Sequence, residues 1–134
     1  MAMVEMVFVL PLLLLLIFTI AQFGLMFSRW LTLSNAVREG AREAVAFRAP
    51  PSGCDAGTVA LNARERVERY ASAGGIRTGP DPATDLKVEI EGHCTGPTND
   101  TTVKGTYPFP VQVPFLSSLG TITLSYSSSM RNEG

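Results

Sequence analysis

The hydrophobic pattern divides the chain into an apolar beginning and a mixed remainder. Residues 6–27 are apolar except for Thr19 and Gln22. As an α-helix this segment would be about 33 Å long, enough to cross a hydrocarbon core of about 30 Å. No basic flank precedes the segment and no small-residue cleavage site follows it. We therefore expect a retained membrane helix rather than a cleaved secretory signal peptide.

The helical pattern continues beyond the apolar segment. Residues 28–47 contain no proline, and their apolar side chains recur at helical spacing on one face: Leu33, Val37, Ala41, Ala44 and Val45. Several residues of this stretch are small, which allows another helix or a sheet to approach closely. Pro50 ends the helix, because the residue before a proline avoids helical backbone angles. We predict a long N-terminal helix within residues 1–49, apolar at 6–27 and amphipathic at 28–47.

The pattern of residues 50–134 predicts a small globular head that begins with a second helix. Residues 50–53 form a linker, and Asp55 can cap a helix over residues 56–73. The apolar stripe of that helix comprises Val59, Ala63, Val67 and Tyr70. The glycines at positions 74 and 75 then provide a natural C-terminal stop.

After the second helix the hydrophobic period changes to two, which predicts β-strands. The alternation favours strands over residues 86–91, 102–107 and 121–129. The intervening residues 107–120 contain three prolines, which argue against a central strand and favour an edge or an irregular crossing. The predicted fold class is therefore α+β: a long N-terminal helix followed by a small head with a second helix and a short antiparallel sheet.

Charge and composition exclude several classes of function. The chain has 23 Asp, Glu, Lys and Arg residues, a net charge of −1 and no basic block, so we expect no nucleic-acid partner. One histidine and two cysteines are too few for a zinc cluster and for most catalytic sets. Because no nucleophile and base are evident, we expect no enzyme, no cofactor and no metal site.

Two residues of the apolar beginning are costly in a simple anchor. Pro11 has no N–H, so the helix loses its bond to the Val7 carbonyl and should kink or loosen there. Glu5 places a carboxylate near the apolar end, where it needs a partner, a water-filled site or a position among lipid headgroups. Before residue 29 the available cation is the α-amino group, if Met1 is the true N-terminus.

The two cysteines can stabilise the head. A Cys54–Cys94 disulfide would close 40 residues and stabilise by about 4 kcal/mol in the loop-entropy model; two free buried thiols are the alternative. His93 lacks the further ligands that a metal site would need.

A disulfide implies an oxidising compartment, whereas the arginines after the apolar segment would retain the head in the cytoplasm. Both observations agree if a basic leader before Met1 has been removed.

Together these features resemble type IV pilins and pseudopilins, in which a prepilin peptidase leaves a glutamate at mature position five, where Glu5 falls. The finer similarity is to the TadE-like branch of the tight-adherence (Tad, Flp-type) pilus system. VEMVFVLPLL at residues 4–13 looks like that branch's VEFALVLPLL opening, and NAVREGAREA at 35–44 looks like its NAAREGARxA helix. Residues 122–133 also have the family's look. Met6 departs from the aromatic residue usual after this glutamate, which leaves a major or a minor subunit open.

The resemblance implies a structural function. It predicts a subunit that waits in the inner membrane with its head outside the cytoplasm and loses its leader to the prepilin peptidase. The Tad assembly machinery would then extrude it into a helical homo-oligomeric pilus for adhesion, with Met1, Glu5 and Pro11 as assembly residues. The alternative is a single-pass anchored extracellular binding or assembly protein, such as a minor pseudopilin or an adhesin, that does not form the shaft.

Overall fold

The computed structural model describes residues 2–46, 55–92, 94, 100–111 and 120–131. In chain order it contains α1 (Ala2–Ala46), α2 (Ala56–Ala73), β1 (Lys87–Glu91), β2 (Asp100–Pro110) and β3 (Thr121–Arg131). The strands form one antiparallel sheet in the order β1-β2-β3. The predicted α+β fold class is confirmed.

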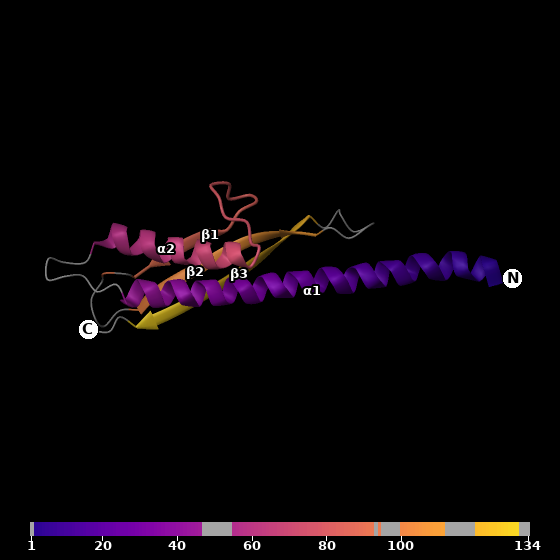
Figure 1. The fold of residues 1–134 in the computed structure, drawn as a ribbon, viewed down its shortest axis with the longest axis horizontal. Coiled ribbons are helices and arrows are strands. Elements are labelled where there is room, and N and C mark those ends of the chain that lie inside the picture. The colour runs from indigo at the N-terminus through magenta and orange to yellow at the C-terminus, as the bar shows by residue number, and fades with distance from the viewer. Residues whose placement is uncertain (1, 47–54, 93, 95–99, 112–119, 132–134) are drawn as a thin grey trace.

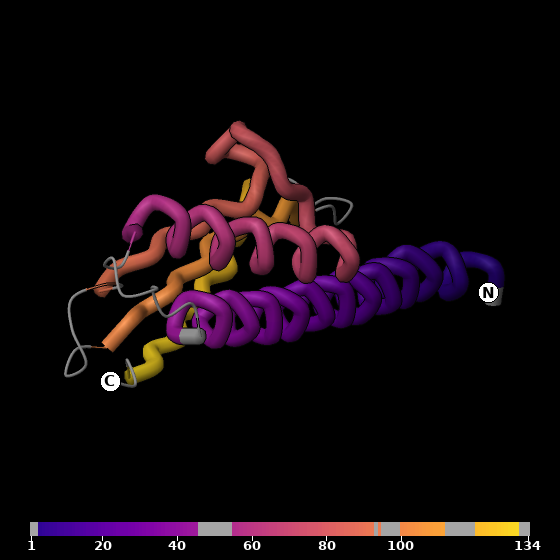
Figure 2. Tube along the Cα trace, turned by 60° about the vertical axis from the view of Figure 1, so that its left-hand side comes forward, coloured from indigo at the N-terminus to yellow at the C-terminus, as the bar shows by residue number. Residues whose placement is uncertain are grey.

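Two layers make up the head. The second half of α1 and the whole of α2 lie side by side against one face of the sheet, with α1 over β2 and β3 and α2 beside β1 (Figures 1 and 2). The first half of α1 extends out of the head, so its N-terminal end lies far from every other element (Figure 1). The last described residues of β3 lie at the opposite end of the molecule.

The core of the head forms where α1 meets α2 and β2. Leu33 and Val37 of α1 are fully buried, as are Val67 of α2 and Val103 of β2. The predicted apolar face of residues 28–47 therefore packs as expected, with Val45 half-buried at its end. Because this part of α1 supplies core side chains, the long helix and the head share one hydrophobic core.

Two glycines allow the elements of this core to approach closely. A Cβ at Gly40 would collide with the Val67 side chain and would lie 3.2 Å from the Ala63 carbonyl oxygen. A Cβ at Gly105 would lie 2.7 Å from a Val37 methyl group. Glycine at these positions brings α2 and the sheet close to α1.

The second helix begins and ends as the sequence predicts. The Asp55 carboxylate accepts a hydrogen bond of 3.1 Å from the Gly57 amide, and the Gly74 amide donates to the Tyr70 carbonyl at 3.3 Å. The predicted stripe is wrong at its last member, since Tyr70 is 49% exposed and Ala71 is fully buried. The buried residues follow a strict i, i+4 row, Val59, Ala63, Val67 and Ala71, because that row lies against α1.

The prediction of an edge for the proline-rich segment is confirmed at its beginning, although these residues extend a strand that is central elsewhere. Tyr107 to Pro110 belong to β2, which is the central strand of the sheet. β1 pairs with β2 only as far as Lys87 and Thr106, whereas β3 pairs with it to Pro110. Both Pro108 and Pro110 thus lie where β2 has a single neighbour, and a missing N–H can face the unpaired side. Residues 112–119 lie outside the described part.

Candidate functional site

The first half of α1 is an exposed apolar surface. Every residue from 3 to 21 is exposed, including Phe8, whose side chain is 76% exposed. We call residues 3–21 the free segment. By length and composition α1 can cross a membrane, and its most apolar stretch is not buried by the rest of the chain. The free segment is about 28 Å long, close to the roughly 30 Å of a hydrocarbon core. A helix that is apolar all round requires lipid or other helices around it.

The head begins to contact α1 directly after the free segment. The Gln22 side-chain amide donates to the Pro110 carbonyl at 3.3 Å, and Met26 packs against the core. One turn further, the Arg29 guanidinium donates to the Gly74 carbonyl at the end of α2. These contacts determine which part of α1 is available to lipid or to neighbouring helices.

Glu5 lies in the free segment, where no described lysine or arginine side chain is paired with it. The next charged residue along the chain is Arg29, which is about 36 Å further along the helix. Among the described residues no ion pair involves Glu5. Met1 lies outside the described part, so the pairing of Glu5 with an α-amino group remains a prediction.

Pro11 does not end the helix. α1 is α-helical from Ala2 to Ala46, and Pro11 lies inside it. The ring still removes one donor, so the Val7 carbonyl has no helical N–H from position 11. How far this loosens the helix remains a prediction.

The predicted disulfide is not tested. Cys94 lies beyond β1 in the left-handed backbone region, with φ of 64°, and Cys54 is outside the described residues. The Cys54–Cys94 bridge therefore remains a prediction.

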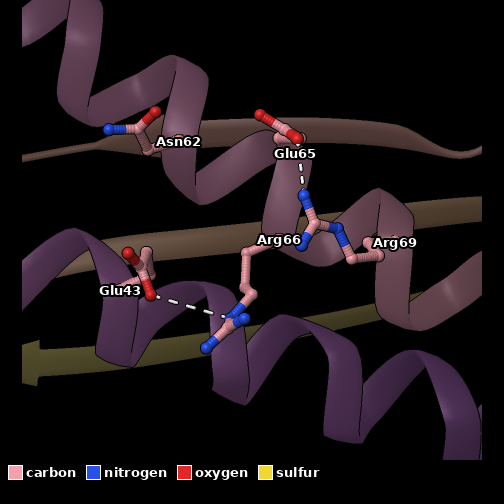
Figure 3. A pocket seen from close by; sticks show the side chains of 5 residues that line it. All are labelled: Glu43, Asn62, Glu65, Arg66 and Arg69. Atoms are coloured by element: carbon pink, nitrogen blue, oxygen red, sulfur yellow. Dashed lines mark hydrogen bonds and ion pairs between the residues drawn. The ribbon is translucent and has the colours of Figure 1, made fainter.

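The groove between α1 and α2 contains paired charges. Arg66 of α2 lies 3.6 Å from a Glu43 carboxylate oxygen and 3.5 Å from one of Glu39 on α1. Beside it, the Arg69 guanidinium lies 2.7 Å from Glu65 (Figure 3). Because these guanidinium groups already have carboxylate partners, the groove supports helix packing more than ligand binding. Among the described residues no group of three or more His, Cys, Asp or Glu could hold a metal ion.

An aromatic row was not foreseen from the sequence. The rings of Phe27 and Trp30 stack with centroids 6.1 Å apart, and Trp30 meets Tyr126 of β3 edge to face at 6.3 Å. The Arg38 guanidinium lies over the same Tyr126 ring and donates to its hydroxyl at 2.9 Å. The available signal was Phe27 at the end of the apolar segment and Trp30 three residues later, but their partner on β3 becomes evident from the fold.

These features define a class of protein: one membrane-spanning-capable helix continuous with a small α+β head. Residues 1–42 match the model of the TadE-like protein family, which confirms the resemblance over the motif at 4–13 and over residues 35–42 of the second motif. The match covers 42 of the 134 residues and ends within α1, so the resemblance of residues 122–133 remains a prediction. Comparisons with curated proteins and with solved structures found no match.

Proposed function

We propose that this protein is a structural pilin subunit of the tight-adherence pilus system. The observation that carries the proposal is the free segment. It is an apolar helix that extends beyond the head and is not covered by the other described residues. Such a surface can exchange lipid for neighbouring helices at little cost, because lipid tails and leucine side chains are similarly apolar. The same segment would therefore anchor the subunit before assembly and form the core of a filament afterwards.

The proposed subunit has a defined location and defined partners at each stage. The subunit resides in the inner membrane with its head outside the cytoplasm, and a prepilin peptidase removes its leader. The Tad machinery then assembles copies through their N-terminal helices into an extracellular pilus for adhesion. The Glu5 carboxylate supports this proposal, since an ionisable group in an apolar helix is retained where it has a function.

Fractionation combined with imaging tests the proposal. Fibres sheared from cells are imaged by electron microscopy, and their subunits and those of the membrane fraction are identified by mass spectrometry. We expect the chain to be abundant along the fibres, and to remain in the membrane fraction of matched cells that lack the assembly machinery. A chain that stays in the membrane while normal fibres form without it would favour the alternative, an anchored binding or assembly protein.

A further inference from the structure

The end of the head nearest the free segment exposes aromatic and aliphatic side chains. Phe27 is 50% exposed and Trp30 is 37% exposed, although each has an aromatic neighbour. Tryptophan combines a large apolar ring with one N–H donor, so it favours the boundary between apolar and aqueous phases.

The end of the β2–β3 hairpin contacts α1 at Gln22, about one turn before Phe27 and two turns before Trp30. Gln22 binds the carbonyl of Pro110, and Pro110 pairs with Thr121 at the start of β3. The next residue, Ile122, is 42% exposed. The described residues 105–111 and 120–130 contain no charged side chain, and neither do residues 6–28 of α1. Both elements at this end of the head therefore lack the charges that would resist a lipid surface.

The spacing along α1 places this surface at a particular depth. If Glu5 lies at one boundary of a hydrocarbon core of about 30 Å, the opposite boundary falls roughly 20 residues later, near Leu25. Phe27 and Trp30 then lie about 3 Å and 8 Å beyond that boundary, within the headgroup layer. The hairpin end, beside Gln22, then lies about 5 Å on the hydrocarbon side of that boundary.

We propose that Phe27, Trp30 and the hairpin end at Ile122 form a surface that docks into the headgroup layer of a phospholipid membrane. The inference rests on the proposed membrane anchoring and adds the depth and the contact surface of the head. Lipid is the occupant because the surface is continuous with the free segment and its distance from Glu5 matches a bilayer. Docking keeps Glu5 at the opposite boundary and limits the tilt of the head before assembly.

Trp30 is the single tryptophan of the chain and therefore a built-in probe. The full chain is reconstituted into phosphatidylcholine vesicles that carry bromine either near the headgroups or deep in the acyl chains, since bromine quenches nearby tryptophan fluorescence. We expect the shallow bromines to quench Trp30 more strongly than the deep ones. Acrylamide, added to the water, should quench it weakly.

Two relocated probes serve as controls. In Trp30→Phe/Phe18→Trp the probe lies in the free segment, where deep bromines should quench it most. In Trp30→Phe/Tyr70→Trp it lies on an exposed position of α2, where acrylamide should quench it and brominated lipid should not. If the position-18 probe is quenched and Trp30 is not, the inference is wrong and the anchoring survives. If neither is quenched by lipid, both are wrong.

The contribution of the hairpin end is tested separately. Ile122→Glu should cause a loss of the shallow-bromine quenching of Trp30, because a carboxylate opposes docking. Ser127→Glu is the matched control, since Ser127 lies further along β3 opposite Lys104 and is exposed. Equal quenching of Trp30 in the two variants would show that the hairpin end is not part of the docking surface. Shielding of Trp30 that instead increases with the protein-to-lipid ratio would identify a second copy as the occupant and overturn the proposal.

Discussion

Gly40 of α1 lies directly against Val67 of α2, and no β-carbon fits between them. Val67 is fully buried and its χ1 is restricted by β-branching, so its methyl group cannot move aside easily. The carbonyl of Ala63 limits the same space from the α2 backbone. The α1–α2 distance therefore depends on the absence of a side chain at position 40.

Gly40→Val should destabilise the head. The added side chain overpacks a core contact, which lowers the free energy of unfolding by about 1–3 kcal/mol. Urea unfolding of the protein in detergent, followed by a signal from the head, measures the loss. Gly24→Val is the matched control, because Gly24 is also within α1 and has nothing within 4 Å of a built Cβ. Equal stabilities of the two variants would contradict the packing argument.

Most of the fold could be predicted because its elements carry local signals. The caps of α2 and the strand signal of β1 depend on neighbouring residues, and both elements occur where the pattern places them. Tyr70 was misassigned because burial on α2 depends on where α1 crosses it. The extension of the central strand over Pro108 was not foreseen, because the length of β1, a separate element, determines whether β2 has a second neighbour at that residue.

The candidate site was predictable to the extent that it depends on composition. An apolar helix with Glu5 as its sole charge is evident from the chain itself. The contact between Trp30 and Tyr126 was not, because it joins residues far apart in the sequence. The partner of Glu5 was not predictable either, since it depends on the terminus or on another molecule.

The cap of α2 should make stability depend on pH. Hydrogen bonds from the Thr58 hydroxyl and the Gly57 amide hold the pKa of Asp55 below its ordinary value. A pKa lowered by folding contributes stability above the unfolded-state pKa of about 3.9, and this is lost as the pH falls through the folded-state pKa. Asp55→Asn still caps but does not titrate.

Thermal unfolding at several pH values measures the cap. The Tm of the native chain minus the Tm of Asp55→Asn should be constant from about pH 7 to pH 5. Below about pH 4 this difference should fall, because the native chain loses the contribution of its ionised cap. Thr58→Val, which removes the hydroxyl donor, raises the folded-state pKa of Asp55 toward its unfolded-state value and should make that change smaller. A difference that stays constant down to the lowest pH would exclude this role of the Asp55 carboxylate.

The head should contain a Cys54–Cys94 disulfide. The intact mass of the unreduced protein should be about 2 Da lower than after reduction, because the bridge lacks two hydrogens. Breaking it should lower the free energy of unfolding by up to about 4 kcal/mol. Cys54→Ser and Cys94→Ser should each cause the same loss as the double variant. Alkylation of both thiols in native, unreduced protein would refute the bridge.

Pro11→Ala should stabilise the helix locally. Alanine restores an N–H donor to the Val7 carbonyl and removes the clash of the proline ring with the preceding turn. Amide hydrogen exchange around residues 7–11 of the protein in detergent should become slower, and the stacking of subunits in fibres should change. Leu14→Ala, in the same segment but away from the proline, controls for the loss of side-chain volume. Identical exchange in native protein and Pro11→Ala would show that the helix is not loosened there.

Glu5→Ala should separate membrane insertion from assembly. The free segment remains apolar, so the variant should still enter the membrane, and its head should unfold as in the native chain. In a bundle of helices the carboxylate needs an amine from its own chain or, to set axial register, from a neighbour. Removing one partner of such a pair costs about 3–5 kcal/mol through the charge left unpaired. We therefore expect few or no fibres from Glu5→Ala.

Glu43→Ala is the control, because Glu43 pairs with Arg66 inside its own head at 3.6 Å. Normal fibre yield from Glu5→Ala cells, counted by electron microscopy, would defeat this mechanism.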